Sequence, residues 1–380
     1  MSIIDIRFLL FRIYIGDGYM KKERNSNFEL LRIISILMVI LSHLCLFSGI
    51  VEKNSIMSIQ SILFSSLRIG VIANYIFIII TGFFMINSEV KYEKIISLIL
   101  ETLLYSISIF VILKMFGIIE INAIQMIKSF FPMFFGNWFV IYYILLYLLI
   151  PYLNKFIKNI SKKEFTCLLV LLLFLNFIIP TFTNNIWNYT YHDFFITAYF
   201  IGTYIKLYCE DKFKNNKKII LLIILGCSFG IFSVFIMQYF GNSFGITSFI
   251  NKPEYFIRNS YSIYPLFMAL LFVLLFRNIK IKNSKIINYI SASTLGIYLI
   301  HENFLMRDLI WKKIFIIDFN SGVINILLFA LVKVVIVFIL CLFIDKIRIL
   351  LFGNIIEKLS VKLKDFFSEI INRFLVMNNE

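Results

Sequence analysis

Three ionisable side chains, Glu29, Arg32 and His43, lie in an otherwise apolar stretch near the start of the sequence. If this stretch is helical, Arg32 and His43 share one face about 16 Å apart along the axis, with Glu29 beside Arg32. A neutral histidine can take a proton from a hydroxyl as a general base. An arginine can bind a phosphate through two parallel hydrogen bonds. The pattern predicts a phosphate-bearing substrate held near Arg32 and a reaction at His43.

The same side chains also have structural interpretations. Near the end of a membrane helix, Arg32 can extend to lipid headgroups, and His43 can be a hydrogen-bonded core residue. An ionisable group at the centre of a membrane helix costs about 2.5 to 3.5 kcal/mol on insertion scales. The functional interpretation is therefore favoured more strongly for His43, which lies within a run of Leu, Ile, Val and Met, than for Arg32. Two further ionisable residues in apolar runs, Glu101 and Lys333, either pair with each other or each face a cavity.

The composition places this helix in a membrane. Hydrophobic residues make up 60% of the 380 residues and charged residues 16%, whereas soluble domains have roughly half and a quarter. We therefore predict an all-α, polytopic membrane bundle of about ten transmembrane helices. Three of the predicted spans, 138–153, 194–208 and 286–302, are shorter than the ~20 residues of a perpendicular crossing and could be broken or line a water-filled cavity. The other predicted spans cover residues 30–50, 69–86, 95–116, 165–182, 218–240, 260–276 and 323–345.

The positive charge predicts the orientation of these helices. The chain carries a formal charge of +15 from 37 Lys and Arg against 22 Asp and Glu, which in a soluble protein would suggest nucleic acid. Most of these cations fall in alternate connecting segments, on the same side as the N-terminus. Since cytoplasmic loops are enriched in Lys and Arg, both termini are predicted to be cytoplasmic. Anionic headgroups of the bilayer then account for the charge, and no nucleic-acid partner is expected.

The sequence divides into three predicted regions. Residues 1–29 form a cytoplasmic N-terminal segment without the pattern of a cleavable signal, and Met20 is an alternative start of translation. Residues 30–345 form the membrane domain. Residues 346–380 form a cytoplasmic tail whose apolar residues recur every three or four positions, as in an amphipathic helix on a membrane surface. The five cysteines have no metal-ligand spacing, so no metal site is expected.

Charged and aromatic residues at the end of the ninth predicted span and just after it form a second candidate site. His301, Glu302 and Arg307 follow closely on one another, and Trp138 begins the fourth predicted span. Aromatic rings can pack against the apolar face of a sugar while charged groups bond its hydroxyls. We therefore consider His301, Glu302, Arg307 and Trp138 as acceptor-binding residues. The alternative is an interfacial belt, in which such side chains only mark the headgroup level.

The spacing of Arg32 and His43, with ten residues between them, resembles the first helix of the acyltransferase 3 family of integral-membrane acyltransferases, many of which O-acetylate bacterial surface glycans. In that family both residues are regarded as functional, so the resemblance implies catalytic roles for His43 and Arg32. Many members carry two arginines after the second helix, where this chain has Lys91 and Lys94, which lack the planar guanidinium fork. The resemblance covers residues 24–345 and includes the segments 81–85, 137–153, 199–206 and 293–303.

The resemblance implies an O-acetyltransferase that moves an acyl group, most simply acetyl, from cytoplasmic acyl-CoA to a hydroxyl of a cell-surface or lipid-linked glycan. Such an enzyme lies in a bacterial-type cytoplasmic membrane and takes acetyl-CoA as a substrate, with no permanently bound cofactor. We expect Arg32, Glu29, Lys91 and Lys94 to bind the donor, and His43 to activate the acceptor hydroxyl. Direct transfer is expected, because no Ser or Cys stands out as an activated nucleophile.

The alternative function is export of a lipid-linked sugar or a small anion, with Arg32 and His43 lining the path. Many secondary transporters are built from two matching halves, and no such repeat is evident in this sequence. The sequence specifies neither the glycan, nor the acyl group, nor the oligomeric state.

Overall fold

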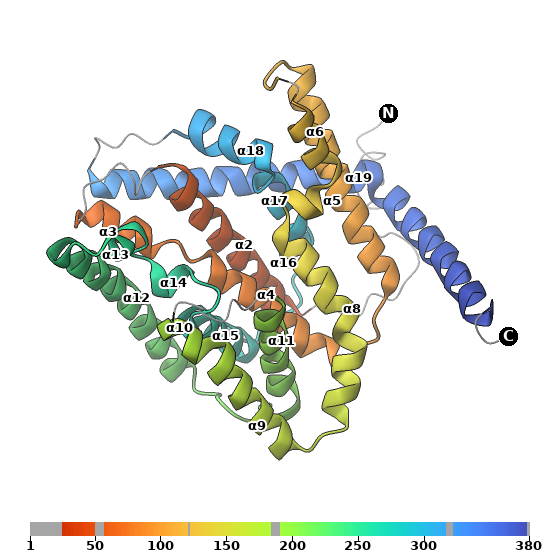
Figure 1. The fold of residues 1–380 in the computed structure, drawn as a ribbon, viewed down its shortest axis with the longest axis horizontal. Helices are drawn as coiled ribbons and strands as arrows, with labels where there is room; N and C mark the ends of the chain where they lie inside the picture. The colour runs from red at the N-terminus through yellow and green to blue at the C-terminus, as the bar shows by residue number, and fades with distance from the viewer. Residues whose placement is uncertain (1–24, 50–56, 121, 184–190, 317–321, 378–380) are drawn as a thin grey trace.

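The computed structural model describes residues 25–49, 57–120, 122–183, 191–316 and 322–377, and all its regular elements in these ranges are helices (Figure 1). The predicted all-α class is confirmed. Residues 1–24, which hold most of the predicted N-terminal segment and Met20, lie outside the described residues. The helices are α2 (Ser26–Phe47), α3 (Ile59–Ser66), α4 (Gly70–Met85), α5 (Tyr92–Met115), α6 (Ala123–Phe130), α7 (Pro132–Phe135), α8 (Trp138–Lys158), α9 (Lys162–Leu173), α10 (Ile179–Thr183), α11 (Tyr191–Tyr208), α12 (Asn216–Phe244), α13 (Thr247–Asn251), α14 (Tyr255–Arg258), α15 (Ile263–Asn278), α16 (Lys285–Ser291), α17 (Thr294–His301), α18 (Phe304–Asp308) and α19 (Val323–Met377), with π-helical turns η1 (Phe174–Ile178) and η2 (Leu309–Ile314).

Seven helical segments of the described chain are long and apolar enough to cross a membrane. Three predicted spans, 194–208, 260–276 and 286–302, coincide with helices outside these seven: α11, α15, and the pair α16 and α17. The count of ten spans and the orientation of the termini stay predictions. Short helices cross a bilayer only when neighbouring helices cover their ends.

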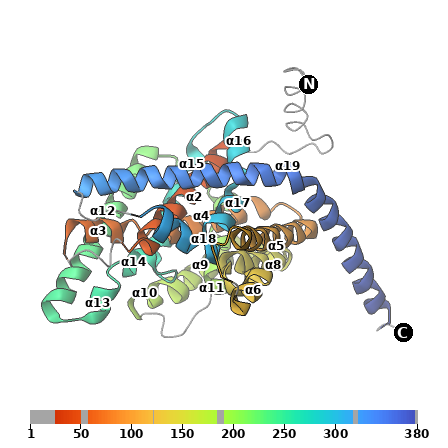
Figure 2. The ribbon, with the colours of Figure 1, turned by 90° about the horizontal axis from the view of Figure 1, so that it is seen from above.

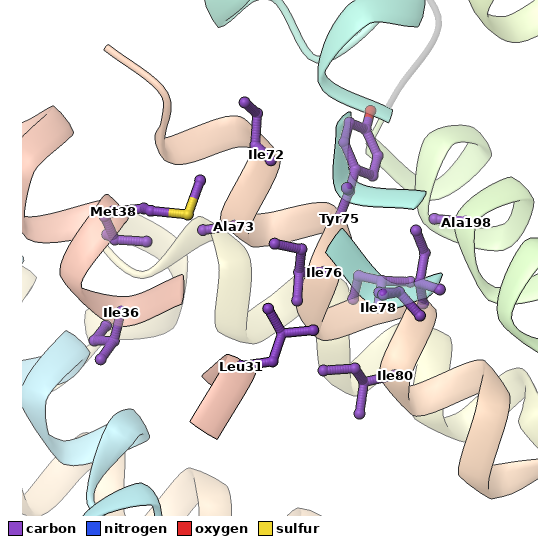
Figure 3. Close-up of a cluster of buried hydrophobic side chains, with 14 of the residues drawn as sticks. Leu31, Ile36, Met38, Ile72, Ala73, Tyr75, Ile76, Ile78, Ile80 and Ala198 are labelled. Carbon is purple, nitrogen blue, oxygen red and sulfur yellow. The ribbon is translucent and has the colours of Figure 1, made fainter. Parts of the chain in front are cut away.

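Helix α2 lies at the centre of the bundle, where it contacts α4, α15, α16, α17 and α19. Leu31 and Met38 share one buried face of the helix and lie beside Ile76 and Ala73 of α4, whereas Ile36 is buried on the opposite side of α2 (Figure 3). The helix begins at a side-chain cap, because Asn25 Oδ1 accepts a hydrogen bond from the backbone of the second residue of α2. Because α2 is packed against these neighbouring helices, its side chains are held in fixed positions.

Helices α4 and α11 approach each other more closely than ordinary side chains permit. A Cβ atom on Gly82 would overlap the backbone carbonyl of Tyr199, and one on Gly202 would overlap that of Ile79. Small residues allow such close packing of membrane helices. Helix α4, held against α11 in this way, also packs against α2 and supports it.

Helix α19 runs unbroken through residue 346, the predicted boundary between membrane domain and tail. It lies along one side of the bundle, and its C-terminal part projects away from the other helices (Figures 1 and 2). Ile355, Leu359, Phe366 and Ile370 are exposed on that part. That these residues lie on a membrane surface stays a prediction.

A buried ionic cluster joins α19 to α5. Asp345 Oδ1 accepts a hydrogen bond from Tyr105, at 2.5 Å, and pairs with Arg348, at 2.6 Å. The Arg348 guanidinium also lies 3.3 Å from Glu101 Oε2. Lys333 donates instead to the carbonyl of Ile316. Of the two alternatives considered for Glu101 and Lys333, a pair with each other is therefore wrong.

Candidate active site

His43 lies in the last turns of α2 and meets two residues at the end of α17. Its Nδ1 is 3.1 Å from His301 Nε2 and 3.0 Å from Glu302 Oε2. His301 is fully buried, and the side chains of Glu302 and His43 are 7% and 16% exposed. The first helix and the ninth predicted span thus bring together three residues that the sequence analysis had divided between reaction and acceptor binding.

The local fold explains why Glu302 points back at α2. Helix α17 ends at His301, and Glu302 is its C-cap. Asn303 then caps α18 by accepting a hydrogen bond from the Leu305 backbone. One turn later, Arg307 donates to Glu302 Oε1 at 3.3 Å. Two short helices around a tight junction therefore fix the carboxylate between His43 and a guanidinium.

Hydrogen bonds define the tautomer of His43. His301 Nδ1 lies 2.5 Å from the carbonyl oxygen of Ile297. A carbonyl only accepts, so Nδ1 of His301 carries the proton and, in the neutral ring, Nε2 is the acceptor. His43 Nδ1 must then donate to His301 Nε2. This leaves Nε2 of His43 unprotonated, with a lone pair that can accept a proton, as a general base requires.

One carboxylate oxygen of Glu302 receives no hydrogen bond at this site within the described part of the chain. Its Oε2 is buried and has no hydrogen-bond partner among the described residues, although it lies close to His43 Nδ1. A buried carboxylate oxygen without a donor is costly. Once His43 takes a proton during catalysis, the nearby carboxylate can stabilise the imidazolium that forms.

Arg32 and Glu29 lie at the opposite end of α2. Arg32 Nη1 pairs with Glu29 Oε1 at 2.8 Å, and Glu29 Oε2 accepts a hydrogen bond from Ser291 at the end of α16. Glu29 is buried, whereas the Arg32 side chain is 31% exposed. The buried carboxylate therefore orients a guanidinium that remains accessible at the end of the bundle predicted to be cytoplasmic.

Lys91 and Lys94 lie at this same end of the bundle. Both are exposed, at the N-terminal end of α5. The end of α4 that precedes them packs on the start of α2, because Phe28 contacts the rings of Phe83 and Phe84. The residues expected to bind a donor thus share one end of the molecule, and the residues expected to act on an acceptor share the other.

Trp138 belongs to an aromatic cluster and lies farther from His43. It lines an open cavity of about 440 Å³, and its ring contacts Phe139 and Phe195. Phe139 contacts Tyr298, which contacts His301. Trp138 therefore reaches the His43 cluster through two intervening rings. The other cavity-lining residues are Met133, Phe134, Phe135, Gly136, Ile141, Tyr142 and Leu145.

A second charged cluster near the His43 end was not identified from the sequence. Arg68, just before α4, pairs with Glu254 at 2.7 Å and donates to the carbonyl of Cys45 at 3.1 Å. Arg258 pairs with the same glutamate at 3.3 Å. Arg68 and Glu254 lie far apart in the sequence in connecting segments, so no local spacing indicates their pairing. Their one sequence signal is that both are charged residues at the edges of apolar runs.

Comparison with known protein families identifies the class of protein. A family model described as an acyltransferase domain matches residues 25–346. The chain belongs to the acyltransferase 3 family. The resemblance inferred from Arg32 and His43 is thereby confirmed, and both residues lie within the matched range. Together with the seven apolar helices, the domain identifies a multi-pass membrane acyltransferase. No curated protein and no solved structure matches the chain.

Proposed function

We propose that this acyltransferase moves an acyl group, most simply acetyl, from cytoplasmic acyl-CoA to a hydroxyl of a cell-surface or lipid-linked glycan, in a bacterial-type cytoplasmic membrane. The observation that carries the proposal is the hydrogen-bonded series from Ile297 through His301 to His43, which leaves His43 Nε2 as a base. Membership of the acyltransferase 3 family supports the transfer reaction over export of a lipid-linked sugar or small anion.

In the proposed reaction His43 acts on the acceptor. Its Nε2 takes the proton of the hydroxyl as the oxygen attacks the thioester carbonyl. The tetrahedral intermediate then expels the thiolate of CoA, the C–S bond breaks, and the thiolate takes up the proton from His43. General base catalysis of this kind contributes on the order of 10² to 10⁴ in rate. Glu302 stabilises the transient imidazolium through its charge, since Oε2 lies 3.0 Å from Nδ1.

The donor is proposed to bind at the other end of α2. The phosphates of acyl-CoA would meet Arg32, which Glu29 holds in place, and the exposed Lys91 and Lys94. Arg32 and His43 are about 16 Å apart along the helix axis. The extended pantetheine arm of CoA can span that separation, so the thioester can reach His43 while the phosphates stay at the end predicted to be cytoplasmic.

The proposal is tested with purified protein in vesicles supplied with acetyl-CoA labelled in the acetyl group. An acyltransferase should release free CoA and place label on an added glycan or, more slowly, on water. An exporter should leave the thioester intact. Wild-type protein that binds the glycan yet releases no CoA above the rate in empty vesicles would contradict the proposed reaction.

A further inference from the structure

We infer that Arg258 and Arg307 form an anion-binding pair beside His43, so that the acceptor carries a phosphodiester or carboxylate group close to the hydroxyl that is acylated. The inference rests on the proposed function and adds the chemical class of the acceptor. Arg258 ends α14 and Arg307 lies in α18. Arg307 lies over the ring of Phe47, which contacts the ring of His43. Arg258 shares Glu254 with Arg68, which donates to the carbonyl of Cys45, two residues after His43.

In both ion pairs the carboxylate is buried and the guanidinium group is partly exposed. Glu254 and Glu302, the carboxylate partners, are 2% and 7% exposed, whereas the side chains of Arg258 and Arg307 are 47% and 33% exposed. Each buried carboxylate therefore holds a guanidinium from behind and leaves its outer edge accessible. This is the arrangement expected where an arginine is preorganised for an outside ligand.

Most hydrogen-bonding capacity of the two guanidinium groups is unused. Among the described residues, the hydrogen bond that each donates goes from Nη1 to its glutamate, which leaves the other N–H donors of the fork open. The Arg307 guanidinium also lies 4.5 Å from the ring of Phe47, and that ring is 5.5 Å from the ring of His43. The contact with Phe47 therefore places the Arg307 guanidinium one ring away from the base.

Among the described residues, two arginines share one buried carboxylate. Arg68 is 5% exposed and pairs with Glu254 at 2.7 Å. Arg307 is similarly matched to Glu302. Arg258, at 3.3 Å from Glu254, brings a further positive charge to a carboxylate that is already paired. An anionic group on the acceptor would bring negative charge to this shared site.

An anionic group bound by two arginines would also orient the acceptor. Guanidinium groups bind phosphate and carboxylate through parallel hydrogen bonds, which fix direction as well as position. The two side chains come from different elements, so an anion between them is held from two directions. A hydroxyl next to that anion is then directed at His43 Nε2, and a neutral glycan lacks the group that would hold it.

The test compares two soluble oligosaccharides of equal length, one of uronic acid units and one neutral, with protein in vesicles of zwitterionic lipid. Equilibrium binding is measured by fluorescence, and transfer is measured from labelled acetyl-CoA. Wild-type protein should prefer the uronic acid oligosaccharide by about tenfold or more, since hydrogen bonds to charged groups contribute about 1.5 to 3 kcal/mol. Salt should weaken binding of the uronic acid oligosaccharide alone.

Substitutions then assign the preference to the two arginines. Arg258→Gln and Arg307→Gln should weaken binding of the uronic acid oligosaccharide and raise its KM, with the KM for acetyl-CoA unchanged. Lys312→Gln removes an exposed cation that is paired with Asp308, 2.9 Å away, and should have no effect. Equal binding of both oligosaccharides by wild-type protein would overturn the inference.

Two further outcomes separate the possible causes. If the arginine variants differ from wild type only in vesicles that contain anionic lipid, the pair binds headgroup phosphate and the inference about the acceptor is overturned. Arginine-dependent binding of the uronic acid oligosaccharide without release of CoA would support the anion site and contradict the proposed acyl transfer.

Discussion

At the scale of single residues, the sequence predicts a role for His43 but not the side chains that surround it. A histidine within a membrane helix, on the same face as an arginine, is a local pattern. The contact with His301 and Glu302 depends on how α17 ends against α2, and it joins residues more than 250 positions apart. Because the pairing arises from tertiary packing, the sequence indicated Glu302 only as an acceptor-binding candidate.

Glu302→Gln tests the charge behind His43. The amide keeps the size of the side chain but cannot stabilise an imidazolium electrostatically, so kcat should fall by about 10²-fold or more. The KM for acyl-CoA should stay unchanged, because the donor is proposed to bind at the other end of α2. Steady-state kinetics with both substrates varied measure this. A rise in acceptor KM with kcat preserved would show that Glu302 binds the acceptor instead.

Arg32→Lys tests the guanidinium fork at the proposed donor site. Lysine keeps the charge but cannot form two parallel hydrogen bonds to a phosphate, so the KM for acyl-CoA should rise by roughly tenfold. The rate at saturating donor should change little. Dephospho-CoA thioesters, which lack the 3′-phosphate, provide the comparison. If Arg32 binds that phosphate, the substitution should raise the KM for these thioesters less than the KM for acyl-CoA. An unchanged donor KM would remove Arg32 from the site.

At the scale of elements, long apolar helices were predicted more accurately than short ones. Hydropathy located α2, α5 and α12, because each is long enough to show a continuous apolar run. The region of the ninth predicted span is instead two helices, α16 and α17, with the polar residues Ser291 and Ser293 at their junction. Hydropathy averages over such a junction. Ser291 lies there, buried against Glu29, and links this break to the proposed donor site.

Gly202→Ala tests the close packing of α4 and α11. The new Cβ would overlap the backbone carbonyl of Ile79, which cannot move aside as a side chain could. Overpacking of this kind costs about 1 to 3 kcal/mol, and thermal unfolding in detergent should occur at lower temperature. Gly353→Ala, in α19, is the matched control because its Cβ would meet no atom closer than 3.6 Å. Equal unfolding temperatures for the two variants would contradict the proposed support role.

At the scale of the whole molecule, composition and charge were the informative features. The 60% hydrophobic content predicted a membrane bundle, and an all-helical architecture with seven segments able to span a membrane agrees with it. The uneven distribution of Lys and Arg predicts the orientation, with the Arg32 end of α2 in the cytoplasm. Neither feature could predict that α19 continues as one helix beyond residue 346, since helical propensity does not end at the membrane boundary.

Cysteine labelling tests the predicted orientation. Lys158 and Lys312 are both exposed, and they lie on opposite sides of the membrane in the predicted topology. An impermeant maleimide should label Lys312→Cys in intact cells and Lys158→Cys only after permeabilisation. The unsubstituted protein, with its five cysteines, sets the background. Labelling of Lys158→Cys in intact cells would reverse the orientation and place the proposed donor site outside.

The role of His43 as the general base is the central claim, and its most direct test is the ester-linked acetate on surface glycans of cells that produce His43→Ala at normal abundance. The substitution removes Nε2, the proposed acceptor of the hydroxyl proton, and leaves the distant Arg32 and Glu29 pair in place. Mass spectrometry should find the acetate reduced to the level of cells that lack the gene. Acetate equal to that of cells with the wild-type protein would contradict the account.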